Sequence, residues 1–168
     1  MRVKGIILMA LVGFLGSTAL AQNDRGKAEA TVNRKTLRID YGRPLLYGRD
    51  VLSLAPIGSV WRLGADQATE IETNGTLNVA GTTVEAGRYS LWAKKTGADD
   101  WVLAFHETTG IWGQPELTEG YIAELPLNVE TAGGEADQLT IALEARDGNA
   151  VIDIHWGKAR LSGSFSVK

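Results

Sequence analysis

The sequence predicts an all-β fold: a single antiparallel β-sandwich or jelly-roll-like domain of about ten strands. Three observations support this class. Apolar and polar residues alternate through most of the chain, turn signals separate the alternating stretches, and helical periodicity is nearly absent after the N-terminal segment. A closed barrel would produce the same pattern, so the sequence leaves sandwich and barrel as alternatives.

The first 21 residues have the layout of a cleavable secretory signal peptide. Arg2 and Lys4 precede an apolar run at residues 6–15, and Ala19-Leu20-Ala21 forms a small-residue cleavage site. The run is too short to span a bilayer, and no cysteine follows it, which excludes a lipoprotein. We therefore expect a mature domain at residues 22–168, located in the periplasm or secreted.

Composition limits the possible partners of this domain. Two of the 17 basic residues and none of the 20 acidic ones lie in the leader, so the mature chain carries a net charge of about −5. It has no polybasic stretch, and we expect neither nucleic-acid binding nor a membrane span. The chain has no cysteine, so its stability must come from its hydrophobic core, which a domain of this size can provide.

The strands are expected in the following order. After a flexible lead-in at residues 22–28, Leu37, Ile39 and Tyr41 face one way along a strand that ends at Gly42-Arg43-Pro44, because proline cannot donate to a central ladder. Asn74-Gly75 and Asp147-Gly148 are hairpin signals, and one helical turn fits residues 52–55 or 59–63. Further strands are expected at residues 68–73, 76–80, 82–85, 87–95, 101–106, 121–131, 138–145, 149–156 and 159–167.

The connection at residues 56–70 carries the densest chemistry in the chain. Trp61 offers a flat apolar face, and Arg62 offers a planar fork of donors suited to a carboxylate. With Arg43 folded back beside them and Asp66 as an acceptor, these residues predict a ligand pocket at the end of the sandwich. The alternative is that Trp61 closes the core and Arg62 pairs with Asp66 or Glu70, because ion-pair networks imitate functional sites.

Other patterns bear on catalysis and metal binding. Asp66 and Glu70 are four residues apart, and paired carboxylates serve glycosidases, but on a strand the two need not face each other. The histidines, His106 and His155, lack the HxH or HExxH spacing of metal ligands. We expect no metal, no cofactor and no catalytic residue, and keep His106 as a candidate ligand contact.

Trp112 follows a glycine-containing turn. With Trp92 and Tyr121 it is a candidate aromatic platform for a sugar ring, although large aromatic side chains of β-proteins mostly pack in the core. Motifs of covalent or nucleotide chemistry, such as GxSxG, a Walker loop or GxGxxG on a strand-to-helix turn, are absent from the sequence.

Three motifs carry a family resemblance: Asp40-Tyr41-Gly42-Arg43-Pro44, the run from Pro56 to Thr69 around Trp61-Arg62-Leu63-Gly64-Ala65, and Ala86-Gly87-Arg88-Tyr89-Ser90. In these the chain resembles an exported bacterial family of unknown function, domain family 2911, from about Ala28 to the C-terminus. The resemblance implies a signal peptide, one β-sandwich-like domain and no assigned activity. Many relatives carry Asn in place of Asp66, and the segment from Gln114 to Leu127 departs from the family pattern.

Together these patterns predict an exported module that binds a small molecule or glycan. Its candidate ligand-binding residues are Arg43, Trp61, Arg62, Asp66, His106 and Trp112. The first alternative is a structural or partner-binding domain that uses an edge strand as its contact surface; the sequence indicates no particular protein partner. The second is a hydrolase, and the residues favour a binding module over an enzyme.

Overall fold

The computed structural model describes residues 24–50, 52, 54–115, 117 and 119–168. Within these ranges it contains ten strands and no helix, which confirms the expected all-β class. The strands are β1 (Arg25–Val32), β2 (Lys35–Gly42), β3 (Val60–Trp61), β4 (Thr69–Thr73), β5 (Leu77–Val79), β6 (Thr82–Val84), β7 (Gly87–Lys95), β8 (Trp101–His106), β9 (Tyr121–Arg146) and β10 (Asn149–Val167). The expected signal peptide at residues 1–21 lies outside the described residues.

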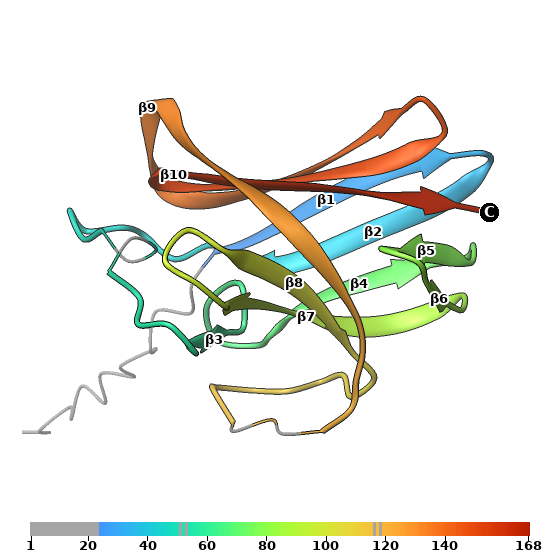
Figure 1. Cartoon of the computed structure of the whole chain (residues 1–168), viewed down its shortest axis with the longest axis horizontal. Coiled ribbons are helices and arrows are strands. Elements are labelled where there is room, and N and C mark those ends of the chain that lie inside the picture. The colour runs from blue at the N-terminus through green and yellow to red at the C-terminus, as the bar shows by residue number, and fades with distance from the viewer. Residues whose placement is uncertain (1–23, 51, 53, 116, 118) are drawn as a thin grey trace, which may run out of the picture.

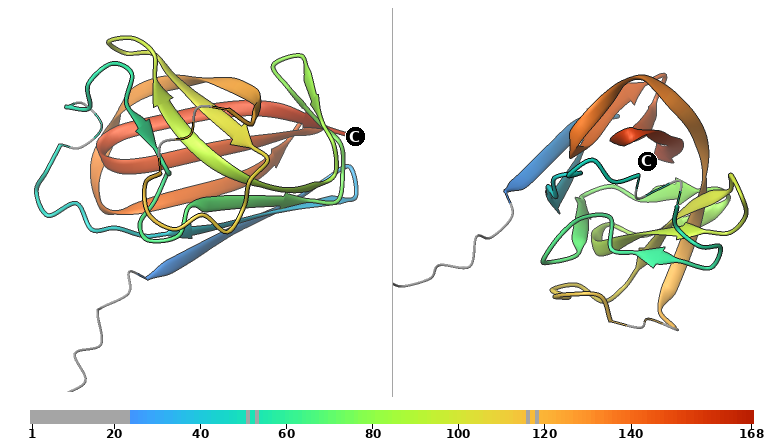
Figure 2. Two further views of the ribbon diagram at one scale, coloured as in Figure 1. Left: turned by 90° about the horizontal axis from the view of Figure 1, so that it is seen from below. Right: turned by 90° about the vertical axis from the view of Figure 1, so that its left-hand side faces the viewer.

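The ten strands form one antiparallel sheet (Figure 1). Its order is β1-β2-β4-β7-β8-β9-β10-β5-β6, with β3 paired to β7 beside this path. The 26-residue β9 bends, so its first part pairs with β8 and its second part with β10. The sheet therefore folds back on itself, and β9 and β10 lie over the layer of β1, β2, β4 and β7 (Figures 1 and 2). Its end strands β1 and β6 do not pair with each other, and an antiparallel bridge between Leu45 and Gln138 joins the chain after β2 to β9.

The core fills the space between the two layers. In β2, Leu37, Ile39 and Tyr41 are buried while Arg38 is exposed, which confirms the predicted alternation. Leu37 and Ile39 belong to the same apolar cluster as Ile152 of β10. Burying an aliphatic side chain of this size contributes about 1.5–3 kcal/mol, so this cluster can hold together a domain that has no disulfide.

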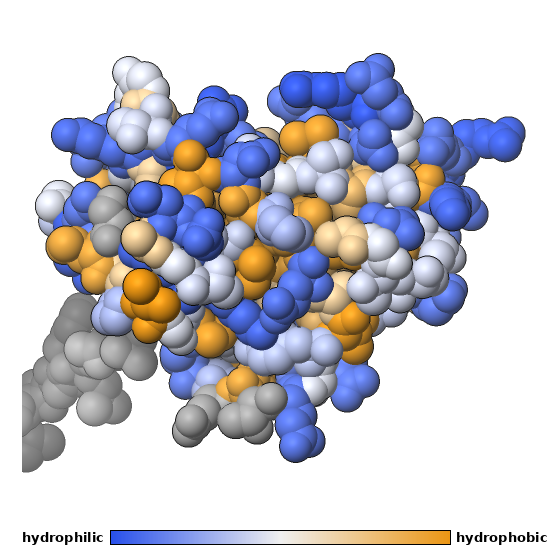
Figure 3. Space-filling model, in the orientation of Figure 1, coloured by the Kyte–Doolittle hydropathy of each residue, from blue (hydrophilic) through white to orange (hydrophobic). Residues whose placement is uncertain are grey.

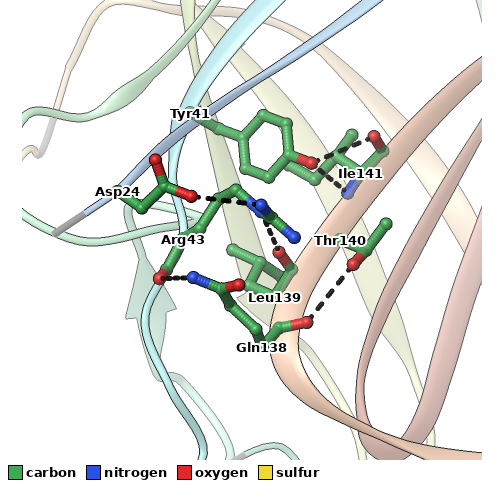
Figure 4. A network of polar contacts seen from close by, with 7 residues as sticks. All are labelled: Asp24, Tyr41, Arg43, Gln138, Leu139, Thr140 and Ile141. Carbon is green, nitrogen blue, oxygen red and sulfur yellow. Dashed lines mark hydrogen bonds and ion pairs between the residues drawn. The ribbon is translucent and has the colours of Figure 1, made fainter.

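The second part of β9 has β10 on one side. On its other side lies the chain at the end of β2 (Figure 4). The Tyr41 hydroxyl accepts a hydrogen bond from the Ile141 N–H (3.0 Å) and donates one to the Ile141 carbonyl (3.3 Å). Arg43 Nε donates to the Leu139 carbonyl (3.4 Å), and Gln138 Nε2 donates to the Arg43 carbonyl (3.0 Å). Because buried edge groups need partners, Tyr41 and Arg43 join the two layers.

Gly42 brings two of the sequence motifs into direct contact. A Cβ atom at this position would lie 2.1 Å from the carbonyl oxygen of Ala65 and 2.8 Å from its nitrogen. Both of these atoms are backbone and cannot move aside. The end of β2 and the loop that follows Trp61 and Arg62 therefore pack together only because residue 42 has no side chain.

The two predicted hairpin turns have different outcomes. Asp147 and Gly148, with φ of 50° and 78°, connect β9 directly to β10, as expected. The hairpin predicted at Asn74-Gly75 is wrong. β4 before this turn pairs with β2 and β7, whereas β5 after it pairs with β10 and β6. The Asn74 side chain instead accepts a hydrogen bond from the Thr36 N–H (2.8 Å), and the turn leads the chain from one layer to the other.

Other boundaries also differ from the prediction. The flexible lead-in is wrong from Arg25 onward, because β1 begins there and exposed Lys27 and Glu29 alternate with buried alanines at the sheet edge. Residues 59–63 contain β3 and no helical turn. The strands expected at residues 121–131 and 138–145 form one continuous strand, β9, and those expected at 149–156 and 159–167 form one continuous strand, β10. The pairing of β9 with β10 shifts register between His155 and Ala159.

Candidate functional site

The outer face of the sheet carries a polar cleft of about 440 Å³. Its lining residues come from β1, β2, β4, the start of β7 and the loop before β4, and they include four carboxylates and four cationic side chains. The lining residues are Arg25, Lys27, Ala28, Glu29, Arg38, Ile39, Asp40, Gln67, Glu70, Glu72 and Arg88. Because the numbers of acidic and basic groups are equal, the charged side chains of the cleft leave no net charge.

One row of these charges alternates in sign across four strands. The register places Arg38 opposite both Glu29 and Glu72, and Glu72 opposite Arg88. Arg38 Nε lies 2.7 Å from the Glu29 carboxylate, and Arg88 Nη2 lies 3.0 Å from that of Glu72. The hydrogen bond and charge of Glu29 raise the pKa of Arg38, and those of Glu72 do the same for Arg88. Opposite charges at facing positions favour this strand order.

The neighbouring row places two carboxylates opposite each other, Asp40 on β2 and Glu70 on β4. Like charges at facing positions are unfavourable unless each has its own partner. Arg25 forms an ion pair with Asp40. Glu70 accepts a hydrogen bond from the Gly110 N–H (2.6 Å) and lies 3.8 Å from Arg88 Nη1, with only 12% of its side chain exposed. Glu70 is thus held in a fixed position at the side of the cleft.

The bond to Gly110 fastens a segment of the β8–β9 connection to the sheet. The Ala68 N–H donates to the Ile111 carbonyl (2.8 Å), and the Gly113 N–H donates to the Asp66 carbonyl (3.0 Å). Between these two bonds, Trp112 pairs with Gln67 in an antiparallel bridge. The segment therefore runs as an extra short strand beside the residues that supply Gln67 and Glu70 to the cleft.

Side chains beneath this segment hold it as well. Trp92 is fully buried and its Nε1 donates to Ser90 Oγ (2.9 Å), which in turn donates to the Thr108 carbonyl (2.7 Å). Trp92 forms a small second core with Ala68 and Ala104 on the outer face of the sheet. Trp92 therefore supports the segment from beneath, and Trp112 is the exposed tryptophan among the described residues.

His106 is a buried structural residue. Its Nδ1 accepts a hydrogen bond from the Thr108 N–H (3.0 Å) and its Nε2 donates to the Glu119 carbonyl (2.6 Å), which requires the neutral imidazole. The ring also packs edge-on against Tyr121. Both ring nitrogens are used within the fold, so the expected contact between His106 and a ligand has no support in this geometry.

The second histidine is likewise bound to the backbone. His155 Nε2 lies 3.2 Å from the Gly134 carbonyl, and the neighbouring Asp153 pairs with Arg160 (2.6 Å). Among the residues that the structure describes, no group of three or more His, Cys, Asp or Glu side chains is arranged to hold a metal ion.

The residues of the expected pocket at the end of the sandwich do not line the cleft. Arg43 binds the Leu139 carbonyl and the Asp24 carboxylate (3.2 Å), and so acts within the fold (Figure 4). Trp61 stacks on Trp156 with ring centroids 5.3 Å apart and packs against the main core. The stack on Trp156 matches the alternative in which Trp61 closes the core.

The remaining candidates occupy the loop between β3 and β4. The Nε atom of Arg62 is buried and has no hydrogen-bond partner among the described residues. Asp66 has a φ of 62°, and its carbonyl holds the segment of Trp112. Of the six candidates, Trp112 alone is a large exposed apolar side chain, 65% accessible, and it lies beside a residue of the cleft.

Sequence reasoning missed most of the cleft. Its charges lie at alternate positions of separate strands, such as Arg38 and Asp40 on β2 and Glu70 and Glu72 on β4. A charged outward face is ordinary for a half-buried strand and marks no site by itself. Only the strand order brings them together, since β2 is followed along the sheet by β4 and then by β7.

The fold and the cleft define an all-β domain built on one antiparallel sheet with a polar outer face. The chain belongs to the family described as "Protein of unknown function (DUF2911)", whose model matches residues 23–165. This result confirms the resemblance found in the motifs. The chain matches no curated protein and no solved structure. Within the described residues, no helix has the length and apolar character needed to cross a membrane.

Proposed function

We propose that this domain is an exported binding module that takes up a small polar molecule or a glycan in the cleft of β1, β2 and β4. The observation that carries the proposal is the cleft itself, with a volume of about 440 Å³ and eight charged residues in its lining. Ligand sites are typically concave and contain a few fixed polar groups. Export is supported by the leader-like residues 1–21.

The arrangement of charges supports binding more than catalysis. In the cleft, the carboxylates Asp40, Glu70 and Glu72 each have a cationic neighbour. These side chains are therefore held by contacts within the fold. Fixed carboxylates and guanidinium groups provide acceptors and donors in defined positions, which suits recognition of a polar ligand.

Arg88→Ala is the variant that tests the proposal, with Arg146→Ala as a matched control. Arg88 and Arg146 have similar exposure, 58% and 65%, and each lies 3.0 Å from a glutamate. Arg146 is outside the cleft of Arg88. Exposed ion pairs contribute at most about 1 kcal/mol, so both variants should remain folded.

The measurement is a thermal-shift screen of residues 22–168 with oligosaccharides, cell-wall fragments and small carboxylates. A ligand at a hundred times its Kd stabilises by about 2.7 kcal/mol, which raises the Tm by roughly 5–10 °C for a domain of this size. We expect a ligand whose shift is lost in Arg88→Ala and kept in Arg146→Ala. No shift with any compound, or equal shifts in the two variants, would contradict the proposed site.

A second candidate function, binding of a partner protein, is favoured by a different observation. The loop between β2 and β3 exposes several large apolar side chains, and Figure 3 shows apolar surface on the side where Figure 1 places this loop. These side chains are Leu45, Tyr47, Leu54 and Ile57. Exposed apolar patches mark interaction surfaces. Recovery of one partner with the wild-type chain, but not with a Tyr47→Ser/Ile57→Ser variant, would support this function.

A further inference from the structure

Trp112 differs from the other tryptophans in its exposure. It is 65% accessible, whereas Trp92, Trp101 and Trp156 are buried and Trp61 is half-buried against the core. Exposing an indole to water is unfavourable by the area rule for apolar surface. The position is nevertheless firmly built, with backbone hydrogen bonds on both sides of Trp112. A rigid exposed aromatic ring is a feature of contact surfaces.

Trp112 also has a defined relation to the cleft. It pairs with Gln67 across an antiparallel bridge, and residues paired in this way project their side chains to the same side. Gln67 lines the cleft. The indole of Trp112 therefore lies at the rim of the cleft, beside the lining residue Gln67.

The lining selects a class of ligand. Four carboxylates and four cationic groups leave no net charge, so neither an anion nor a cation is attracted as such. Facing strands lie about 4.8 Å apart, and the row from Glu29 through Arg38 and Glu72 to Arg88 presents acceptors and donors in turn. A neutral molecule with several hydroxyl groups can use both kinds of partner, and its ring can pack on the indole.

We propose that Trp112 and the cleft together form a glycan-binding site, in which a neutral pyranose ring stacks on the indole and its hydroxyl groups bond to the charged lining. The inference rests on the proposed function and names the ligand class of the same cleft. Glu70 is a positioning residue in this site. It holds the Gly110 N–H, and through it the segment that carries Trp112, while its other oxygen faces Arg88.

The test uses three soluble probes: cellopentaose, the pentamer of N-acetylglucosamine, and the acidic pentamer of galacturonic acid. Binding to residues 22–168 is measured by calorimetry. Iodide quenching of tryptophan fluorescence is measured in parallel, because Trp112 is the most accessible of the tryptophans. We expect a neutral pentasaccharide to bind and to protect the fluorescence from iodide.

Substitutions separate stacking from folding. Because Trp112 is exposed, Trp112→Ala should unfold like the wild type while binding the neutral probe about tenfold more weakly, and Trp112→Phe should recover much of the affinity. Glu70→Ala should weaken binding and change iodide access to Trp112, whereas Glu70→Gln, which keeps an acceptor for Gly110, should not change that access. Arg146→Ala should bind as the wild type does.

The outcomes distinguish this inference from the proposed function. Binding of a neutral probe that depends on both Trp112 and Arg88 supports both. A compound that needs Arg88 but is indifferent to Trp112→Ala, or a preference for the acidic pentamer, overturns the glycan site and leaves the cleft as a binding site for another class. Failure of all three pentasaccharides to bind overturns the inference.

Discussion

Tyr41→Phe removes one oxygen atom from the junction between the two layers. The hydroxyl of Tyr41 bridges the N–H and the carbonyl of Ile141, and the residue is 3% exposed, so water cannot easily replace the hydroxyl. Each hydrogen bond contributes about 0.5–1.5 kcal/mol net, and a buried donor left without a partner costs about 1–3 kcal/mol. We therefore expect the free energy of unfolding to fall by about 2–3 kcal/mol.

The matched control is Tyr89→Phe. The Tyr89 hydroxyl also donates to a backbone carbonyl, that of Glu85 (2.9 Å), but this bond is exposed to solvent. Water can satisfy the freed carbonyl, and the loss should stay below about 1 kcal/mol. The chemical change is the same in the two variants. They differ in how deeply the hydroxyl is buried and in how many backbone groups it bonds to.

Urea and thermal unfolding followed by circular dichroism measure both variants. A loss of about 2–3 kcal/mol corresponds to a fall in Tm of roughly 5–10 °C for a domain of this size. The reasoning would be refuted if Tyr41→Phe cost no more than Tyr89→Phe. In that case β2 would not depend on its tyrosine to hold the free edge of β9.

Three other predictions concern single residues. Gly42→Ala should cost about 3 kcal/mol or more, because its methyl group meets the backbone of Ala65, while Gly133→Ala, with open space around it, should cost less than about 1 kcal/mol in the same urea assay. Trp61→Ala should cost about 2–4 kcal/mol through loss of the stack on Trp156; a loss below about 1 kcal/mol would show that Trp61 is not part of the core. Burial, and then the charge of Glu124, raise the pKa of Tyr121 in the folded protein above its ordinary value of about 10. The free energy of unfolding should therefore fall as the pH rises above about 10, because the unfolded chain releases this proton first. Tyr121→Phe should lessen this fall, measured by urea unfolding at a series of pH values.

The roles of the motif residues could be predicted only in part. Sequence alone left Trp61 and Arg43 as either ligand contacts or structural residues, because the chemistry of the side chains is the same in both cases. Their partners, Trp156 and the Leu139 carbonyl, are about 95 residues further along the chain. No local pattern contains such a partner, so only the tertiary structure shows these contacts.

Similar limits applied to the turns. Asp147-Gly148 forms its predicted hairpin because the strands on either side pair with each other. Asn74-Gly75 has equally good turn residues, but β5 finds its partner in β10, from the other end of the chain. A turn dipeptide fixes the local backbone and does not select the strands that pair.

By itself the sequence determined the all-β class and the inward and outward faces of strands such as β2, because these depend on period-2 alternation and on local turn chemistry. The tertiary structure alone decided which outward-facing side chains lie next to one another. The cleft exists because the order β1-β2-β4-β7 places Asp40, Glu70 and Arg88 on neighbouring strands. Strand order is set by non-local hydrogen bonds and core packing, and these long-range contacts leave no periodic signal in the sequence.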